Sequence, residues 1–146
     1  MIDVSSPSGL VTATFSPGGE MRPEGLDARA DGFQLWHLTI AGTGFGDRVF
    51  KPHGVWSSDN RFFAVTEYPT PLESLSDLLS KTHILVIDVP PGLECVVAKQ
   101  SRGTVTPISF EGNLLVFSRE IRQAIGLRRI VEIDITQFEN WRPVAA

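Results

Sequence analysis

Few side chains of this 146-residue chain are suited to metal binding or to nucleophilic catalysis. The three histidines are His37, His53 and His83, and the single cysteine is Cys95. No second histidine or cysteine stands at metal-ligand spacing from any of them, so the sequence predicts no metal site. We expect His37 to be a packed or edge residue of a strand and His53 to lie in a loop. Cys95 precedes two valines, which favours a buried, unreactive thiol.

Two further patterns are weak candidates for chemistry. Residues 42–47 are glycine-rich, but their spacing fits neither the dinucleotide fingerprint nor the P-loop, and a hairpin turn explains them better. Glu132 and Asp134 form a carboxylate pair, but they lie on the polar face of a predicted strand, where we expect them to be solvated. The chain contains no Gly-x-Ser-x-Gly nucleophile elbow. The sequence therefore predicts no catalytic residues and no cofactor.

Residues suited to recognising another protein are more frequent. Tryptophan and arginine dominate the binding energy of many interfaces, and Trp141 and Arg142 lie together near the C-terminus. The formal net charge is −4, and most of the 17 acidic residues precede position 99. An acidic surface attracts a basic partner and speeds its association. The acidic segments 20–31 and 67–77 are expected to supply the contact through Glu20, Glu24, Asp27, Asp31, Glu67, Glu73 and Asp77.

Length and composition restrict the class of protein. The chain suits one domain, and 42% hydrophobic with 21% charged residues is ordinary for a globular protein. No apolar run approaches the roughly 20 residues that span a bilayer, and the first residues do not resemble a signal peptide. The single cysteine fits a reducing compartment, so we expect a cytoplasmic protein. The acidic balance argues against nucleic acid as a partner.

The hydrophobic pattern is that of strands, and it repeats. Residues 35–40, 84–89 and 130–135 are rich in β-formers, and the last segment alternates apolar with polar residues. Each segment is preceded by a small turn that opens another strand, at positions 6–9, 57–61 and 111–113. Both sets recur about every 50 residues, a period typical of repeated small sheets. We therefore predict a single all-β domain of consecutive antiparallel hairpins.

One segment resembles a known kind of repeat. Residues 56–61 read Trp-Ser-Ser-Asp-Asn-Arg, and residues 87–92 read Ile-Asp-Val-Pro-Pro-Gly. On these motifs residues 52–99 resemble a blade of the WD-type or TolB-type β-propellers. Ser58 and Asn60 depart from the Pro and Gly of that pattern, although asparagine can adopt the left-handed turn conformation. The resemblance implies about three blade-like hairpin modules, at 4–51, 52–99 and 103–137.

A propeller needs four or more blades, so three modules fall short of closure. We expect the meander to form a partial propeller or a sandwich-like body, or to share strands with a second copy in a homodimer. One or two short helices are predicted, at residues 70–79 and 118–126, because each segment has a helix capping or stop residue. Residues 16–32, rich in glycine and proline, are predicted to form a long irregular loop.

The leading functional hypothesis is a non-catalytic protein that binds another protein through loops at one end of the sheets. Small, acidic, stand-alone chains of this type are similar to bacterial immunity proteins, which occlude the active site of a toxin. That similarity implies a basic toxin as the partner. Two alternatives stay open. One is a β domain that binds a small molecule or a carbohydrate through its aromatic residues, and the other is an enzyme whose site forms between subunits.

Overall fold

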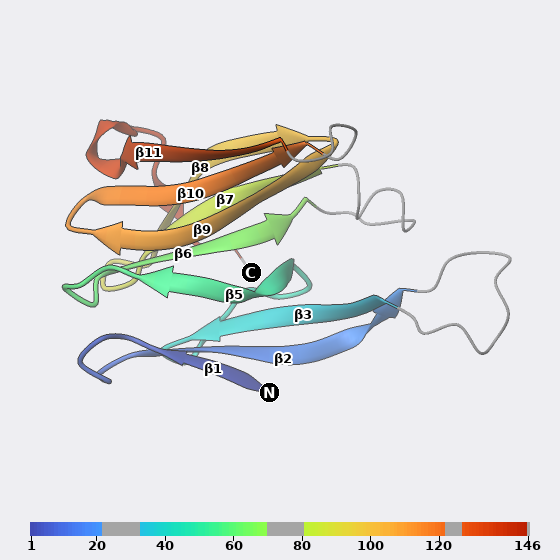
Figure 1. Ribbon diagram of the computed structural model, residues 1–146. Coiled ribbons are helices and arrows are strands. Elements are labelled where there is room, and N and C mark those ends of the chain that lie inside the picture. Colours follow the sequence, from blue (N-terminus) through green and yellow to red (C-terminus); the bar gives the residue numbers. More distant parts are fainter. Residues whose placement is uncertain (22–32, 70–80, 122–126, 146) are drawn as a thin grey trace, which may run out of the picture.

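The computed structural model describes residues 1–21, 33–69, 81–121 and 127–145, and all strand pairs within them are antiparallel (Figure 1). Nine strands form one sheet in the order β1-β2-β3-β5-β6-β7-β8-β12, with β4 paired to β3. Three more form a second sheet in the order β11-β10-β9. The bounds in the large sheet are β1 Ile2–Ser5, β2 Thr12–Met21, β3 Phe33–Ile40, β4 Thr43–Gly44, β5 Val49–Trp56, β6 Phe62–Tyr68, β7 Lys81–Asp88, β8 Leu93–Ser101 and β12 Arg142–Pro143. Those in the small sheet are β9 Gly103–Glu111, β10 Leu114–Ile121 and β11 Arg128–Asp134.

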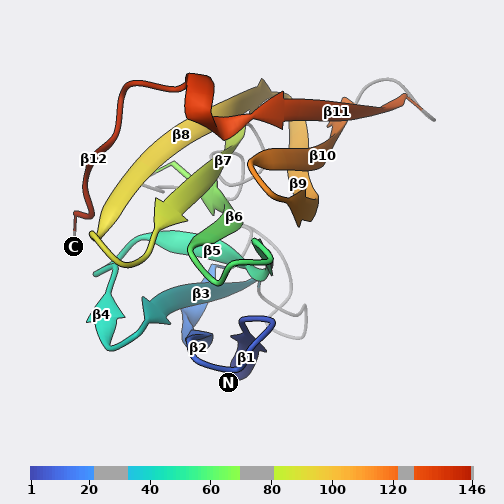
Figure 2. The ribbon, with the colours of Figure 1, turned by 90° about the vertical axis from the view of Figure 1, so that its left-hand side faces the viewer.

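Strands β6 and β7 are buried on both faces, which explains their almost uninterrupted apolar sequences. Their alternate side chains enter two different hydrophobic cores. Phe62 and Ile84 pack against the small sheet, whereas Phe63 and Leu85 pack against side chains of β2 and β3. Figure 2 shows β6 and β7 between these two groups of strands. The centre of the large sheet is therefore the interior of the molecule.

Two of the predicted turns have the same hydrogen bonds. Ser6 donates its N–H to the carbonyl of Val11 at 2.8 Å, and its Oγ accepts from the Val11 N–H at 3.2 Å. Ser57 makes the equivalent pair with Phe62, at 2.8 and 2.9 Å. In each turn the Ser Oγ thus accepts the backbone N–H that a carbonyl would accept in a regular strand pair, at the point where the hairpin opens. The turns at 6–9 and 57–61 therefore share one local structure, in agreement with the repeat spacing.

The same two turns contact each other. Asn60 has φ 63°, which confirms the left-handed conformation expected where the blade pattern has glycine. Its Oδ1 accepts hydrogen bonds from the N–H and the hydroxyl of Ser8, at 3.0 and 2.8 Å. Trp56, just before the second turn, is buried and donates from Nε1 to the carbonyl of Val4 at 2.8 Å. These contacts fix β1 beside the β5–β6 hairpin.

The all-β, antiparallel fold is confirmed, and neither sheet is closed or curled. The border expected between the first two modules, at 51/52, falls inside β5, and the pairing of β3 with β5 places both modules in one sheet. The third module, 103–137, spans β9, β10, β11 and the short 3-10 helix η1, Ile135–Gln137. It forms the separate small sheet. No helix of the described residues is long and apolar enough to cross a membrane.

Three local predictions need correction. Residues 16–21 are not part of an irregular loop but continue β2, with a bulge between Pro17 and Glu20 that accommodates the two glycines. Residues 118–121 are not helical, because they belong to β10, in which 118–120 pair with strands on both sides and Ile121 pairs with β9. His53 lies in β5 rather than in a loop, and its Nε2 donates to the carbonyl of Pro107 at 3.2 Å. His37 lies in β3, half-buried, as expected. The helix predicted at 70–79 lies outside the described residues.

Candidate functional site

A row of polar side chains crosses the middle of the large sheet. Glu67 of β6 pairs in register with His83 of β7, and His83 pairs with Lys99 of β8. Residues directly opposite one another in neighbouring strands point to the same face of a sheet, so the three side chains share one surface.

A β-bulge in β8 brings Lys99 to this face. Leu85 pairs with Val96, but the next residue of β7, Ile84, pairs with Ala98, so Val97 has no opposite residue. The extra residue shifts the alternation of β8 by one position. Without it, Lys99 would point toward the small sheet. The bulge therefore places its ammonium group beside His83.

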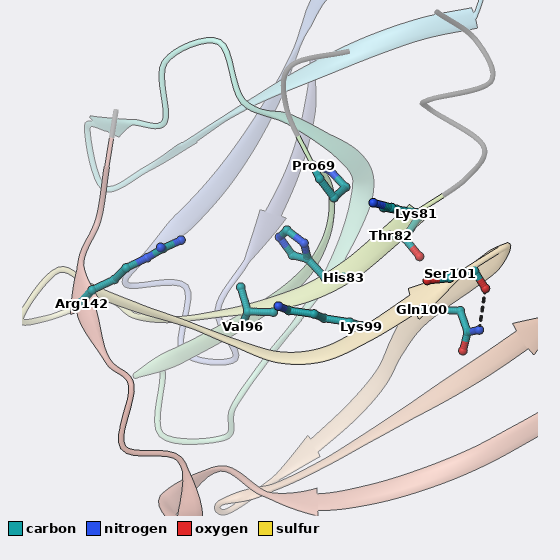
Figure 3. Close-up of a pocket in the computed structure, with 9 residues that line it drawn as sticks. All are labelled: Pro69, Lys81, Thr82, His83, Val96, Lys99, Gln100, Ser101 and Arg142. Carbon is teal, nitrogen blue, oxygen red and sulfur yellow. Dashed lines mark hydrogen bonds between the residues drawn. The ribbon is translucent and has the colours of Figure 1, made fainter. Parts of the chain in front are cut away.

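Around this row lies a pocket of about 470 Å³ (Figure 3). Its lining combines five nitrogen-bearing side chains with apolar surface, and among the described residues that line it there is no carboxylate. Lys99 and Arg142 reach toward Val96 and His83 from two sides in Figure 3. A second hollow of about 330 Å³ adjoins the first, because both are lined by Pro69, His83 and Arg142. The full lining of the larger pocket is Pro69, Lys81, Thr82, His83, Val96, Lys99, Gln100, Ser101 and Arg142.

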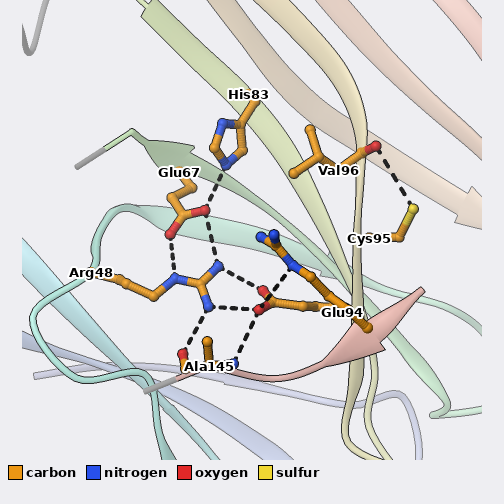
Figure 4. Close-up of polar contacts among 8 residues, drawn as sticks. Arg48, Glu67, His83, Glu94, Cys95, Val96 and Ala145 are labelled. Atoms are coloured by element: carbon orange, nitrogen blue, oxygen red, sulfur yellow. Dashed lines mark hydrogen bonds and ion pairs between the residues drawn. The ribbon is translucent and has the colours of Figure 1, made fainter. Parts of the chain in front are cut away.

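Next to the pocket a partly buried arginine, Arg48, joins two buried carboxylates (Figure 4). Arg48 donates from Nε and Nη2 to Glu67, at 2.6 and 3.1 Å. It donates from Nη1 and Nη2 to Glu94, at 2.9 and 2.6 Å. His83 donates from Nε2 to Oε1 of Glu67 at 2.6 Å, the same oxygen that accepts from Nη2 of Arg48. The planar guanidinium is suited to this double bidentate contact, which a lysine could not make.

The C-terminal segment completes the cluster. Ala145 donates its N–H to Glu94 at 3.1 Å and accepts from Arg48 at 2.9 Å. Arg142 pairs with Glu94 in the backbone register of β12 and β8, and its Nε lies 3.7 Å from the Glu94 carboxylate. The Arg142 side chain is nevertheless 63% exposed, so most of its guanidinium surface faces solvent. The C-terminal segment thus places the guanidinium of Arg142 at the rim of the pocket.

The pKa of Glu67 shows how the cluster is balanced. Burial alone would raise it, but the hydrogen bonds from His83 and Arg48 outweigh burial and hold the pKa below its usual value. The pKa of Arg48 is raised, because its hydrogen bonds to the two carboxylates outweigh its burial. Glu67 is therefore ionised at neutral pH and its charge is matched within the cluster.

Lys81 and Lys99 give the site more positive than negative charge. Arg48 and Arg142 together match the carboxylates of Glu67 and Glu94. Within the part of the chain that the structure describes, Lys81 and Lys99 form no ion pair. Both are exposed at the pocket. Among the described residues the site therefore carries an excess of positive charge, although the chain as a whole has a net charge of −4.

The residues that the sequence assigned to partner binding lie in different parts of the structure. Glu67, expected in an acidic loop, is instead 5% exposed within β6 and fully engaged by Arg48 and His83. Glu20 is exposed near the end of β2. Trp141 packs against Phe62 of the core, with ring centroids 6.0 Å apart, and Arg142 lies at the pocket. Glu24, Asp27, Asp31, Glu73 and Asp77 lie outside the described residues.

The sequence did not reveal Arg48, Lys81, His83 and Lys99 as a group, since they come from three separate segments. A signal for the burial of Glu67 was present, however. It follows five residues of a strand that is buried on both faces, and such a run indicates that the next position is enclosed as well. A carboxylate in such a strand requires a cationic partner.

The described residues give little support for a metal site or a reactive thiol. None of their histidine, cysteine and acidic side chains gather in groups of three or more that could hold a metal ion. Cys95 is buried in the core, and burial raises the pKa of its thiol. Comparison with protein-family models, with curated proteins and with solved structures finds no match. The functional argument therefore depends on the geometry of the pocket.

Proposed function

We propose that this protein is a binding domain for a small organic anion, held in the pocket between β7 and β8. The observation that carries the proposal is the convergence of Lys81, Lys99 and Arg142, with His83 beside them, on one hollow in which none of the described lining residues is a carboxylate. Cationic side chains that converge in this way bind phosphate or carboxylate groups through charge-assisted hydrogen bonds. The pocket volume is in the range of small-molecule sites.

The buried cluster gives the site a fixed geometry. His83 is oriented by Glu67, which is itself held by Arg48, and Arg48 is held by Glu94 and by the C-terminal segment. A binding group positioned in this way loses little freedom when a ligand arrives. The Nε2 of His83 carries a proton, because a carboxylate can only accept.

The proposal is tested by titration at low ionic strength with inorganic phosphate, with citrate and with maltose. The two anions should bind and the neutral sugar should not, which separates this proposal from carbohydrate binding. A Lys81→Gln/Lys99→Gln variant should bind the anions about tenfold more weakly or worse, because each charged hydrogen bond contributes roughly 1.5–3 kcal/mol. Arg129→Gln, an exposed cation on β11, is the matched control and should bind as the wild type does.

Binding that weakens with added salt would support a charge-driven site. Equal affinity of the double variant and the wild type would place the anion elsewhere on the surface. Binding of maltose with no effect of the lysines would replace this proposal with the carbohydrate alternative.

A second candidate is recognition of a protein partner, including the toxin of an immunity pair. It is favoured by the net charge of −4 and by the exposed position of Glu20. Burial of Glu67 removes one residue from the expected contact surface. If a basic protein binds there, Glu20→Lys should slow association, and more so at low salt. An association rate that responds to neither change would exclude this part of the surface. A non-catalytic role and a cytoplasmic location stay predictions.

A further inference from the structure

Strand β11 is an end strand of the small sheet, and in the described part of the chain no strand pairs with its outer edge (Figure 1). Val131 and Ile133 pack on the core, while the opposite face presents Arg128, Ile130 and Glu132. Ile130 is 60% exposed. An open edge with an exposed apolar residue invites pairing with another strand. The edge of β11 is therefore a candidate interface.

The residues of this edge are complementary to themselves. Two copies of β11 can pair antiparallel about a twofold axis perpendicular to the sheet, and this symmetry keeps each face of the strand on the same side. The register must then be centred on a residue. Centred on Ile130, it places Ile130 opposite its own copy. It also places Arg128 opposite Glu132 of the second copy, twice by symmetry.

The neighbouring registers are worse. A register centred on Arg129 places two arginines opposite each other, and like charges in that position are destabilising. A register centred on Val131 places the exposed Ile130 opposite Glu132 of the second copy, so that an apolar side chain meets a charge. The register centred on Val131 also places Arg128 opposite Asp134, but that carboxylate already accepts hydrogen bonds from the N–H and the hydroxyl of Thr136. The register centred on Ile130 matches the exposed isoleucine with itself and Arg128 with a carboxylate, that of Glu132, that no Thr136 hydrogen bond occupies.

The charges within one chain support the same register. Glu120 of β10 pairs in register with Arg128, and their charged groups are 3.8 Å apart. In the paired sheet Arg128 would lie between Glu120 of its own chain and Glu132 of the second copy. Since both members of the existing pair are well exposed, the second carboxylate is reached without unburying any group.

We propose that the protein forms a homodimer in which two β11 edges pair antiparallel with Ile130 on the twofold axis, giving a continuous six-stranded sheet. The inference is independent of the anion pocket, which lies between β7 and β8 of the large sheet. It commits to a second copy of this chain as the occupant, because the pattern of charges is self-complementary. The sequence alone allowed a homodimer, and the structure assigns the surface.

Sedimentation equilibrium tests the oligomeric state and the charges together. The wild type should show twice the 16.0 kDa mass of the chain at high concentration. Arg128→Glu and Glu132→Arg should each weaken the dimer by about tenfold or more, because each creates two like-charge contacts. The double variant, with the charges exchanged, should restore it. Glu111→Arg, on the other edge of the small sheet, is the control and should have no effect.

A wild type that stays monomeric at the highest soluble concentration would overturn the proposal, as would a dimer that neither single reversal weakens. Circular dichroism melting of each variant separates loss of pairing from loss of folding.

Disulfide trapping tests the register. In a Cys95→Ala background, Ile130→Cys should cross-link two chains under mild oxidation, because residues opposite in a sheet have Cβ atoms about 4.5–5.5 Å apart. Arg128→Cys should cross-link much more slowly, since its opposite residue is Glu132. Faster cross-linking through position 128 than through position 130 would contradict the register.

Discussion

Replacement of Arg48 by methionine should destabilise the protein far more than loss of a surface charge. Arg48 donates four hydrogen bonds to two carboxylates, of which Glu94 is 0% exposed and Glu67 is 5% exposed. Methionine keeps most of the apolar stem but leaves both charges without their main partner. Breaking a buried ion pair from one side costs about 3–5 kcal/mol. This is a large part of the 5–15 kcal/mol that stabilises a typical domain.

The loss should depend on pH in a defined direction. In the wild type the pKa of Glu67 is held below its usual value of 4.5, so its contribution to stability is present above that pH and is lost as the pH falls through the lowered pKa. In the variant Glu67 lacks Arg48, so burial, which raises the pKa of this carboxyl, is opposed by fewer hydrogen bonds. Protonation of the buried carboxyl removes its unpaired charge, and this reduces the loss of stability in the Arg48→Met variant. The difference in stability should therefore be largest near neutral pH and should shrink as the pH falls below about 5.

Urea unfolding followed by tryptophan fluorescence measures the difference, at pH 7 and again at mildly acidic pH. Arg102→Met is the matched control, because Arg102 is exposed and forms no ion pair within the described residues. Its loss should stay within about 0.5 kcal/mol. A loss below about 1 kcal/mol for Arg48→Met, or one that is equal at both pH values, would refute a buried charge cluster.

Three further predictions concern the fold. Trp56→Ala should lower the unfolding free energy by about 3–5 kcal/mol, because it empties a core site and removes the hydrogen bond to Val4; a melting temperature close to that of the wild type would contradict this. Cys95 should resist thiol reagents until the chain is unfolded, and rapid labelling in native buffer would count against its burial. Asn60→Ala should cost about 1–2 kcal/mol in urea unfolding and Asn60→Gly less, since glycine tolerates the left-handed backbone and alanine does not; equal losses would argue against strain at this turn.

Local sequence patterns predicted the features that depend on local physics. The strands followed from β-branched and aromatic runs, because such side chains fill a pleated surface. The left-handed Asn60 and the buried Cys95 followed from turn chemistry and from neighbouring valines. Each of these outcomes is decided within about ten residues of chain.

The site could not be predicted in this way, because its residues meet only through pairing between strands. His83 and Lys99 share a face owing to the bulge at Val97, and nothing in the local sequence marks that bulge. Glu67 was expected to be exposed because it is charged. Its burial depends on Arg48, which is distant in sequence and reaches Glu67 only once β5 and β6 have paired. The error at residues 16–21 has a similar origin, since β3 imposes strand geometry on a glycine-rich segment.

The most direct test of the anion site is a citrate titration followed by amide chemical shifts in an isotope-labelled sample. If the pocket binds anions, the largest shifts should map to Thr82, His83, Lys99 and Gln100, which lie side by side in β7 and β8. The chemical shifts of the β1 and β2 amides should not change, because these strands lie at the opposite end of the large sheet from β7 and β8. Shifts that saturate and that disappear in the Lys81→Gln/Lys99→Gln variant are the predicted result. Shifts spread over the whole surface, or confined to other strands, would contradict the account.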